Sequence, residues 1–124
     1  MILNLLYVFI GGGTGSVIRF MIGLLFQRST NNLPLATLAS NVLASLIFAG
    51  VINLIQSRTE DPQSIRLLLL TGLCGGLSTF STFGYETFLL MKQQNYLWMS
   101  LNILISVTLC LSSFFLIKKI NGLQ

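Results

Sequence analysis

The segment Gly72–Glu86, which reads GLCGGLSTFSTFGYE, combines residue types that are unusual in the middle of an apolar chain. Two adjacent glycines precede hydroxyl residues and two phenylalanines, and a carboxylate follows. Because glycine and small hydroxyl residues are poor helix formers, this composition predicts a break in a helix. Backbone carbonyls that such a break releases within a membrane can coordinate a small, hard cation. A kink whose backbone groups are satisfied by serine and threonine side chains is the alternative.

The two phenylalanines of this segment are interleaved with hydroxyl groups. Phe80 and Phe83 flank Ser81 and Thr82, so both rings are expected to face one pathway. The positive edge of an aromatic ring attracts an anion, and hydroxyl and amide groups can donate hydrogen bonds to it. A small anion that sheds its water could pass between such groups. Rings that only pack against lipid or neighbouring helices are the simpler alternative.

Glu86 is the only acidic residue inside one of the apolar runs. On a helix it shares a face with Thr79 and Thr82, which gives a strip of hydroxyls and a carboxylate. An ionisable group within a membrane is a functional hypothesis by default, because its burial is costly. The alternative is a structural carboxylate that reaches the membrane surface or pairs with Arg19. We favour the functional interpretation.

The composition predicts an integral membrane protein. Of the 124 residues, 53% are hydrophobic and 8% are charged, whereas a soluble domain has about 25% charged residues. A membrane-spanning helix needs about 20 apolar residues, so this length accommodates four spans and no soluble domain. The first run lacks the basic start and cleavage site of a signal peptide and is expected to persist as a helix. We expect an all-α fold with a single transmembrane domain, 1–124, and spans of about 2–26, 34–55, 63–91 and 96–117.

The basic residues are scattered along the chain, although its formal net charge is +4. Scattered charges indicate helix-end anchors in a lipid bilayer and no nucleic-acid partner. Four spans place both termini on one side, and the basic residues then divide with only a weak bias between the two sides. Since this bias sets orientation, insertion in both directions is a hypothesis. One side carries Arg58, Arg66, Lys118 and Lys119, and the other carries Arg28 and Lys92.

Small and polar residues recur at helical spacing in the other spans. Such residues allow helices to pack closely and to form hydrogen bonds across their interface. Asn41 and Asn102 fit this simple explanation less well, because an amide within the membrane is costly without partners, and they favour a shared polar interior. Near the start of the chain, Gly11, Gly12, Gly13 and Gly15 are predicted to seat a neighbouring helix. The second span carries Thr37, Ser40, Asn41, Ala44, Ser45 and Phe48 on one face, and the fourth carries Asn102, Ser106, Cys110 and Ser113.

Taken together, these segments resemble a known family. GLCGGLSTFSTF, at residues 72–83, resembles the signature of the Fluc, or CrcB-type, fluoride channels. GGTGSVIRF, at residues 12–20, is similar to the first-helix pattern of that family, and TLASN, at residues 37–41, to its second-helix pattern. The length and the number of spans also match, so the resemblance covers the whole chain.

The resemblance implies a fluoride-selective channel, not an enzyme, that allows passive electrodiffusive efflux of cytoplasmic fluoride through the inner (plasma) membrane. It implies an antiparallel, dual-topology homodimer with its third helix broken mid-membrane. It further implies a structural sodium ion at the dimer centre, held by the backbone carbonyls of Gly75 and Ser78. Arg19 would match the first-helix arginine, with a structural or vestibular role. The implied fluoride pore comprises Phe80, Phe83, Asn41, Ser81, Thr82, Thr37 and Glu86.

Two positions depart from the family pattern, and other protein classes remain as alternatives. Ala44 stands where relatives often have glycine, and Gly84 where the pattern continues with serine. A small dual-topology, four-helix multidrug exporter is the main alternative, but such exporters carry a glutamate in the first helix, and this chain does not. An intramembrane hydrolase is disfavoured because the chain has no histidine. A purely structural subunit would need no aligned polar strip.

Overall fold

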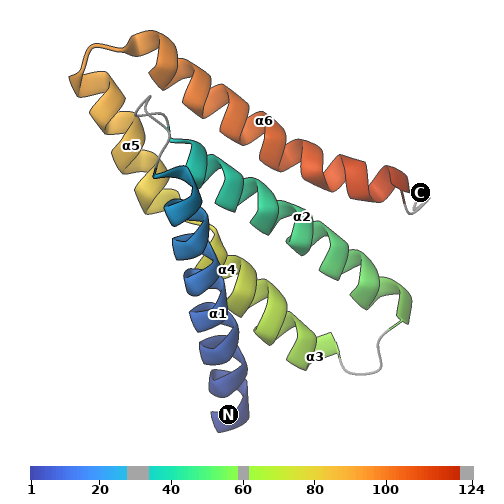
Figure 1. Cartoon of the computed structure of the whole chain (residues 1–124). Helices are drawn as coiled ribbons and strands as arrows, with labels where there is room; N and C mark the ends of the chain where they lie inside the picture. The colour runs from blue at the N-terminus through green and yellow to red at the C-terminus, as the bar shows by residue number, and fades with distance from the viewer. Residues whose placement is uncertain (28–33, 59–61, 121–124) are drawn as a thin grey trace.

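The computed structural model describes residues 1–27, 34–58 and 62–120, and the elements in these ranges are helical. Four stretches are long and apolar enough to cross a membrane: Ile2–Phe26, Leu35–Gln56, Gln63–Lys92 and Tyr96–Ile120. Figure 1 shows them as long rods, of which the third is interrupted partway along. The predicted all-helical architecture with four apolar spans is therefore confirmed.

The third span is assembled from several helical segments, whereas each of the others is one helix. Its segment Arg66–Cys74 is a π-helix, in which the hydrogen bonds close wider turns than in an α-helix. The sequence also indicates a polar turn at residues 28–32 and an N-cap at Asp61, and both positions lie outside the described residues. In chain order the elements are α1 (Ile2–Phe26), α2 (Leu35–Arg58), α3 (Pro62–Ile65), η1 (Arg66–Cys74), α4 (Gly75–Leu77), α5 (Phe80–Lys92) and α6 (Tyr96–Ile120).

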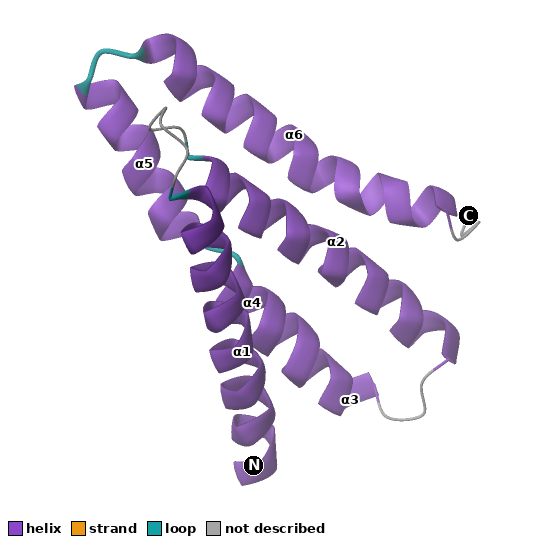
Figure 2. Ribbon diagram, viewed as in Figure 1, coloured by secondary structure: helices purple, strands orange, loops and turns teal. Residues whose placement is uncertain are grey.

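The break lies between α4 and α5, where Figure 2 shows a short loop. Ser78 (φ −77°, ψ 153°) and Thr79 (φ −150°, ψ 112°) are both extended. The sequence predicted a break across residues 75–84, and the structure places it within that stretch but confines it to these two residues. Gly75 is helical (φ −64°, ψ −36°), and helix resumes at Phe80. The non-helical stretch is therefore short and lies directly before the two phenylalanines.

The glycines before the break allow α1 to contact η1 and α4 backbone to backbone. A Cβ added to Gly72 would meet Gly11 Cα at 2.8 Å, and one added to Gly15 would meet Leu77 N at 2.8 Å. Small residues one helical turn apart permit this close approach in membrane proteins. The predicted packing role is therefore confirmed for Gly11 and Gly15. Gly13 instead faces open space, because nothing lies within 4 Å of the added Cβ.

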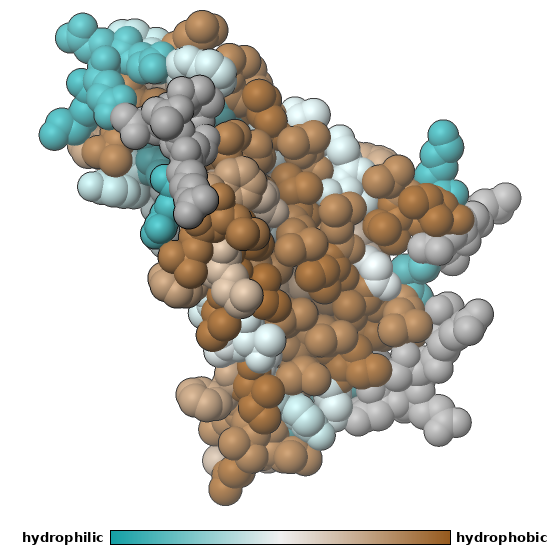
Figure 3. Space-filling view, viewed as in Figure 1, coloured by the Kyte–Doolittle hydropathy of each residue, from teal (hydrophilic) through white to brown (hydrophobic). Residues whose placement is uncertain are grey.

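α2 and α6 lie side by side (Figure 1), and several residues of their polar stripes are buried. Phe48 of α2 meets Phe114 of α6 edge to face, with ring centroids 6.0 Å apart. Figure 3 shows hydrophobic side chains over most of the visible face, with hydrophilic ones gathered toward its ends. This distribution fits a chain whose outer surface contacts lipid, because lipid tails favour apolar side chains. The buried polar residues include Thr37, Ser40, Asn102, Ser106 and Ser113.

Candidate functional site

The extended backbone at the break is held by the side chain of Asn41. The Thr79 N–H donates to Asn41 Oδ1 at 2.7 Å, and Asn41 Nδ2 donates to the Thr79 carbonyl oxygen at 3.4 Å. The amide thus pairs with both backbone groups of one residue, as a neighbouring strand would. Backbone groups that leave a helix within an apolar environment need such partners, because water is absent there. Asn41 therefore stabilises the break itself.

The side chain of Thr79 begins the second half of the third span. Its Oγ1 accepts a hydrogen bond from the Thr82 N–H at 3.2 Å and donates to Thr82 Oγ1 at 2.9 Å. This is N-cap geometry, in which a threonine satisfies a free N–H in the first turn of a helix. Sequence reasoning assigned Thr79 only to the Glu86 face. A threonine directly before the start of a helix is the signal that could have identified it as the cap.

The same hydrogen bonds release two backbone carbonyls. In an unbroken helix the Gly75 carbonyl would accept from the Thr79 N–H, which donates to Asn41 instead. The Ser78 carbonyl would accept from the Thr82 N–H, which donates to the Thr79 side chain instead. Gly75 and Ser78 both line a hollow of about 190 Å³ between α2, α6 and the third span. The part of the chain that the structure describes contains no cluster of three or more His, Cys, Asp or Glu.

Both rings line one cavity, as the sequence predicted. The centroids of Phe80 and Phe83 are 5.8 Å apart and the ring planes are tilted by 39°. The cavity has a volume of about 270 Å³ and receives Asn41 from α2. Phe80 is 84% exposed in the single chain, so its ring forms an open edge of the cavity. The other lining residues are Ser45, Ser78, Thr79, Ser106, Val107 and Cys110.

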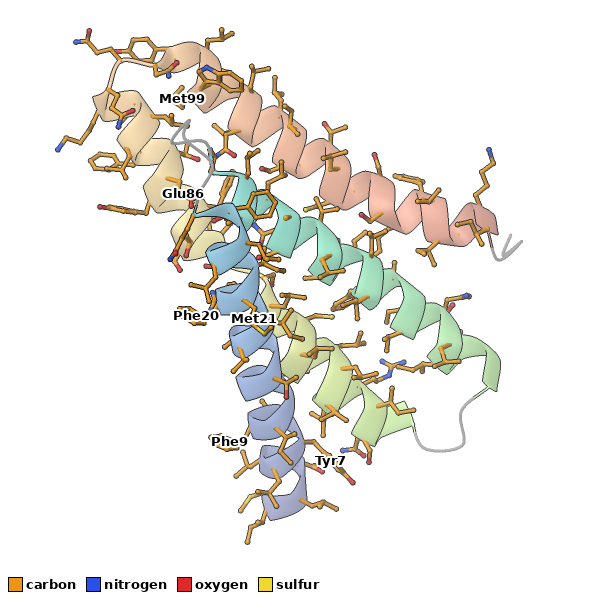
Figure 4. The ribbon with its side chains drawn as sticks, viewed as in Figure 1. Tyr7, Phe9, Phe20, Met21, Glu86 and Met99 are labelled. Carbon is orange, nitrogen blue, oxygen red and sulfur yellow. The ribbon has the colours of Figure 1, made fainter. Side chains whose placement is uncertain are left out.

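Glu86 lies in a second cavity, of about 370 Å³, on the other side of the break. Thr37 Oγ1 donates to Glu86 Oε1 at 2.8 Å, which joins α2 to α5. Figure 4 shows Glu86 on α5 near the C-terminal end of α1, from which Arg19 also lines this cavity. Thr79 and Thr82 line it as well, so the predicted strip of hydroxyls and a carboxylate is present.

Two buried polar atoms of the second cavity have no hydrogen-bond partner among the described residues: Ser40 Oγ and Glu86 Oε2. Ser40 is fully buried, and sequence reasoning assigned it only to a packing stripe. Its position directly before Asn41, on the face that also carries Thr37, is the signal that could have added it to the site. Both atoms remain available to a polar ligand of this cavity.

The predicted site residues therefore divide into two groups that meet at the break. Asn41 lines the cavity of the phenyl rings, whereas Thr37 and Arg19 line the cavity of Glu86. Thr79 lines both cavities. Ser81 has an exposed side chain and lines neither of these two cavities in the single chain. Its Oγ nevertheless lies 3.4 Å from Thr79 Oγ1, at the junction.

A broken span between polar cavities, in a bundle of apolar helices, is an architecture of channels and transporters. The family model described as CrcB-like protein, Camphor Resistance (CrcB), matches residues 6–117, and the chain belongs to the CrcB family. This is an ion-channel family rather than a family of enzymes. The chain is accordingly a multi-pass membrane protein, which in bacteria lies in the plasma membrane.

Individual relatives carry the same functional name. The chain is 40% identical over 126 residues to the fluoride-specific ion channel FluC of Serratia proteamaculans. The aligned region covers 98% of this chain and 99% of the relative. It is 41% identical over 103 residues to the protein of that name from Escherichia fergusonii, and these residues are 83% of this chain and 81% of the relative. The fluoride-specific ion channel FluC of Phocaeicola vulgatus is 43% identical over 94 residues, which are 75% of this chain and 77% of the relative.

The two hydrogen bonds between the Asn41 side chain and the Thr79 backbone, here called the Asn41 clamp, can be tested by substitution. We expect Asn41→Leu to leave the Thr79 N–H and carbonyl without partners, at a cost of about 1–3 kcal/mol for an unsatisfied buried group. The Thr79 amide proton should then exchange with solvent faster, as measured by NMR in detergent micelles. Asn53→Leu is a matched control, since Asn53 lies on the same helix and lines a different cavity. Equal Thr79 protection in both variants would contradict the clamp.

Proposed function

We propose that this chain is a fluoride-selective channel that allows cytoplasmic fluoride to leave the cell passively, down its electrochemical gradient. The observation that carries the proposal is the break at Ser78–Thr79, which opens a cavity between two phenyl rings and an asparagine amide. The names of the bacterial relatives support fluoride as the ion. Hydrogen fluoride crosses membranes as a neutral weak acid and ionises inside, so the trapped anion needs a pore.

The proposed pathway replaces the water that fluoride loses. Asn41 Nδ2 makes only a long bond of 3.4 Å to the Thr79 carbonyl, and its amide group has a second proton to donate to an anion. The edges of the Phe80 and Phe83 rings supply further positive charge. Because these groups approach closely only to a small ion, chloride would lose its water without equivalent compensation. Selectivity thus follows from cavity width and donor strength.

The second cavity supplies the polar continuation of this pathway. Thr82 offers a hydroxyl there, and the resemblance assigns Thr37, Ser81 and Glu86 to the same track. A carboxylate beside an anion pathway is repulsive unless its charge is compensated. Thr37 stabilises one oxygen by donating to Glu86 Oε1, and Arg19, a cationic residue, lines the same cavity. We infer that Thr37 and Arg19 make this region tolerant of fluoride.

An antiparallel homodimer completes the proposed channel. In the single chain, Phe80 is 84% exposed, so its ring borders an open face of the cavity. A second copy would close that face and turn the open cavity into a bounded path. The weak bias of the basic residues supports copies that insert in opposite directions. Two fluoride pathways would then run through the dimer, as the family resemblance implies.

The released carbonyls of Gly75 and Ser78 suit the sodium ion that the family resemblance implies. Oxygen ligands are those that hard cations prefer, and each of these carbonyls has lost its helical donor. A second copy would double the number of carbonyls and give a fuller coordination shell. The ion would link the two breaks and neutralise their carbonyl dipoles. Sodium analysis of desalted protein is expected to give one ion for each pair of chains, and protein free of sodium would contradict the site.

Fluoride efflux from liposomes tests the proposed function. Liposomes that contain the purified protein and a potassium ionophore should release fluoride rapidly, as read with a fluoride electrode. Chloride-loaded liposomes should release little chloride. Phe80→Ala is expected to slow fluoride efflux about tenfold, because losing about 1.4 kcal/mol of stabilisation changes a rate by that factor.

The matched control for this test is Phe9→Ala. Phe9 is 78% exposed, and Figure 4 shows it on α1 far from Glu86, pointing away from the other helices. Its loss should leave the efflux rate unchanged. Equal leakage of chloride, or release that depends on a proton gradient, would contradict a fluoride channel, and the latter would favour the multidrug-type exporter.

The antiparallel arrangement is tested by labelling from one side of the membrane. Gln93 lies in the exposed turn between α5 and α6, so Gln93→Cys should react in about half of the molecules with a membrane-impermeant maleimide applied to intact cells. The two native cysteines, Cys74 and Cys110, are first replaced by alanine, and this background alone should not react. Labelling of all molecules, or of none, would contradict dual topology.

A further inference from the structure

A chain of hydrogen bonds links α5 to α6 through residues that are not part of the proposed pore. Asn102 Nδ2 donates to Thr87 Oγ1 at 3.0 Å, and Thr87 Oγ1 donates to the Phe83 carbonyl oxygen at 2.8 Å. On the other side, Ser106 Oγ donates to Asn102 Oδ1 at 3.5 Å. The chain of donors thus runs from the middle of α6 to the backbone of a pore phenylalanine.

The burial of Asn102 makes this arrangement restrictive. Its side chain is 8% exposed among apolar helices, and both its nitrogen and its oxygen are engaged. An unpaired amide in such a place is costly, so few relative positions of α5 and α6 are tolerated. A shift of α6 by one residue would take Asn102 away from Thr87. The hydrogen bond therefore fixes the register of the two helices.

The register matters because α5 and α6 form opposite walls of the cavity that the rings line. Phe80 and Phe83 contribute one wall, and Ser106, Val107 and Cys110 contribute the other. At the far end of α5 the turn is closed by the Asn95 N–H, which donates to the Leu90 carbonyl at 2.9 Å. Along α5, Thr87 lies between this turn and the rings. Its hydrogen bond to Asn102 of α6 is therefore closer to Phe83 than the turn is.

We propose that Asn102 is a positioning residue that, through Thr87, holds the Phe83 ring at the distance from α6 that admits fluoride and excludes chloride. This inference rests on the proposed function and assigns the selectivity of the cavity to a contact outside it. Asn102 is not among the residues that line the cavity, so it acts through Thr87 and α5. A looser contact would widen the cavity, and a wider cavity discriminates less between anions of different size.

Variants at Thr87 separate the hydrogen bond from the shape of the side chain. Thr87→Val keeps the shape and removes the hydroxyl, whereas Thr87→Ser keeps the hydroxyl. We expect Thr87→Val to slow fluoride efflux about threefold to tenfold and to lower the fluoride-over-chloride permeability ratio measured in planar bilayers. Thr87→Ser should retain both values. Thr108→Val, at an exposed position of α6, is the control for loss of a threonine hydroxyl and should match the wild type.

Asn102→Leu removes the same hydrogen bond by changing its donor on α6. It takes the place of Thr87→Val in the test if the Thr87→Val protein does not fold. Because the two residues act as a pair, the double variant should be no worse than the more impaired single variant. Full additivity of the two effects, or wild-type rates and permeability ratios in both single variants, would overturn the positioning role. If the wild-type protein itself released no fluoride, the proposed function would fail together with this inference.

Discussion

The extended backbone at Ser78 and Thr79 is the constraint on which the remaining structure depends. Within an apolar span, N–H and C=O groups outside a helix have no water to pair with. The side-chain amide of Asn41 takes both backbone groups of Thr79, and the Thr79 hydroxyl takes the N–H of Thr82. A polar residue on α2 and another at the N-cap of α5 are thus required by the backbone before any ion enters. The same bonds leave carbonyls free and place two rings at the start of a helix.

Neighbouring helices hold this break in place from both sides. On the N-terminal side, glycine packing brings the backbone of α1 against η1 and α4, and Leu77 is completely buried there. On the C-terminal side, Thr37 contacts Glu86 and Asn102 contacts Thr87, so α2 and α6 each bind α5 through a side chain. A rigid setting of this kind keeps the rings and donors in fixed positions, as ion selectivity requires.

The sequence predicted the spans because long apolar runs separated by polar residues leave few alternatives. It predicted a break across residues 75–84, whereas only Ser78 and Thr79 leave the helix. Helix propensities describe helices in water, and membrane helices also use glycine for close packing. The pairing of Asn41 with Thr79, and of Asn102 with Thr87, could not be predicted, because those partners lie on different helices and meet only in the folded bundle. The roles of the pore residues, the sodium ion and the dimer remain predictions.

Solid-state NMR of the protein in lipid bilayers can measure the backbone conformation of the break without altering a residue. The ¹³Cα and ¹³Cβ chemical shifts of Ser78 and Thr79 should deviate from random-coil values in the direction of extended backbone, while the ¹³Cα shifts of Gly76 and Phe80 should deviate toward helix. Helical shifts throughout residues 74–83 would contradict this account, because no carbonyl would be released and Asn41 would have no backbone to hold.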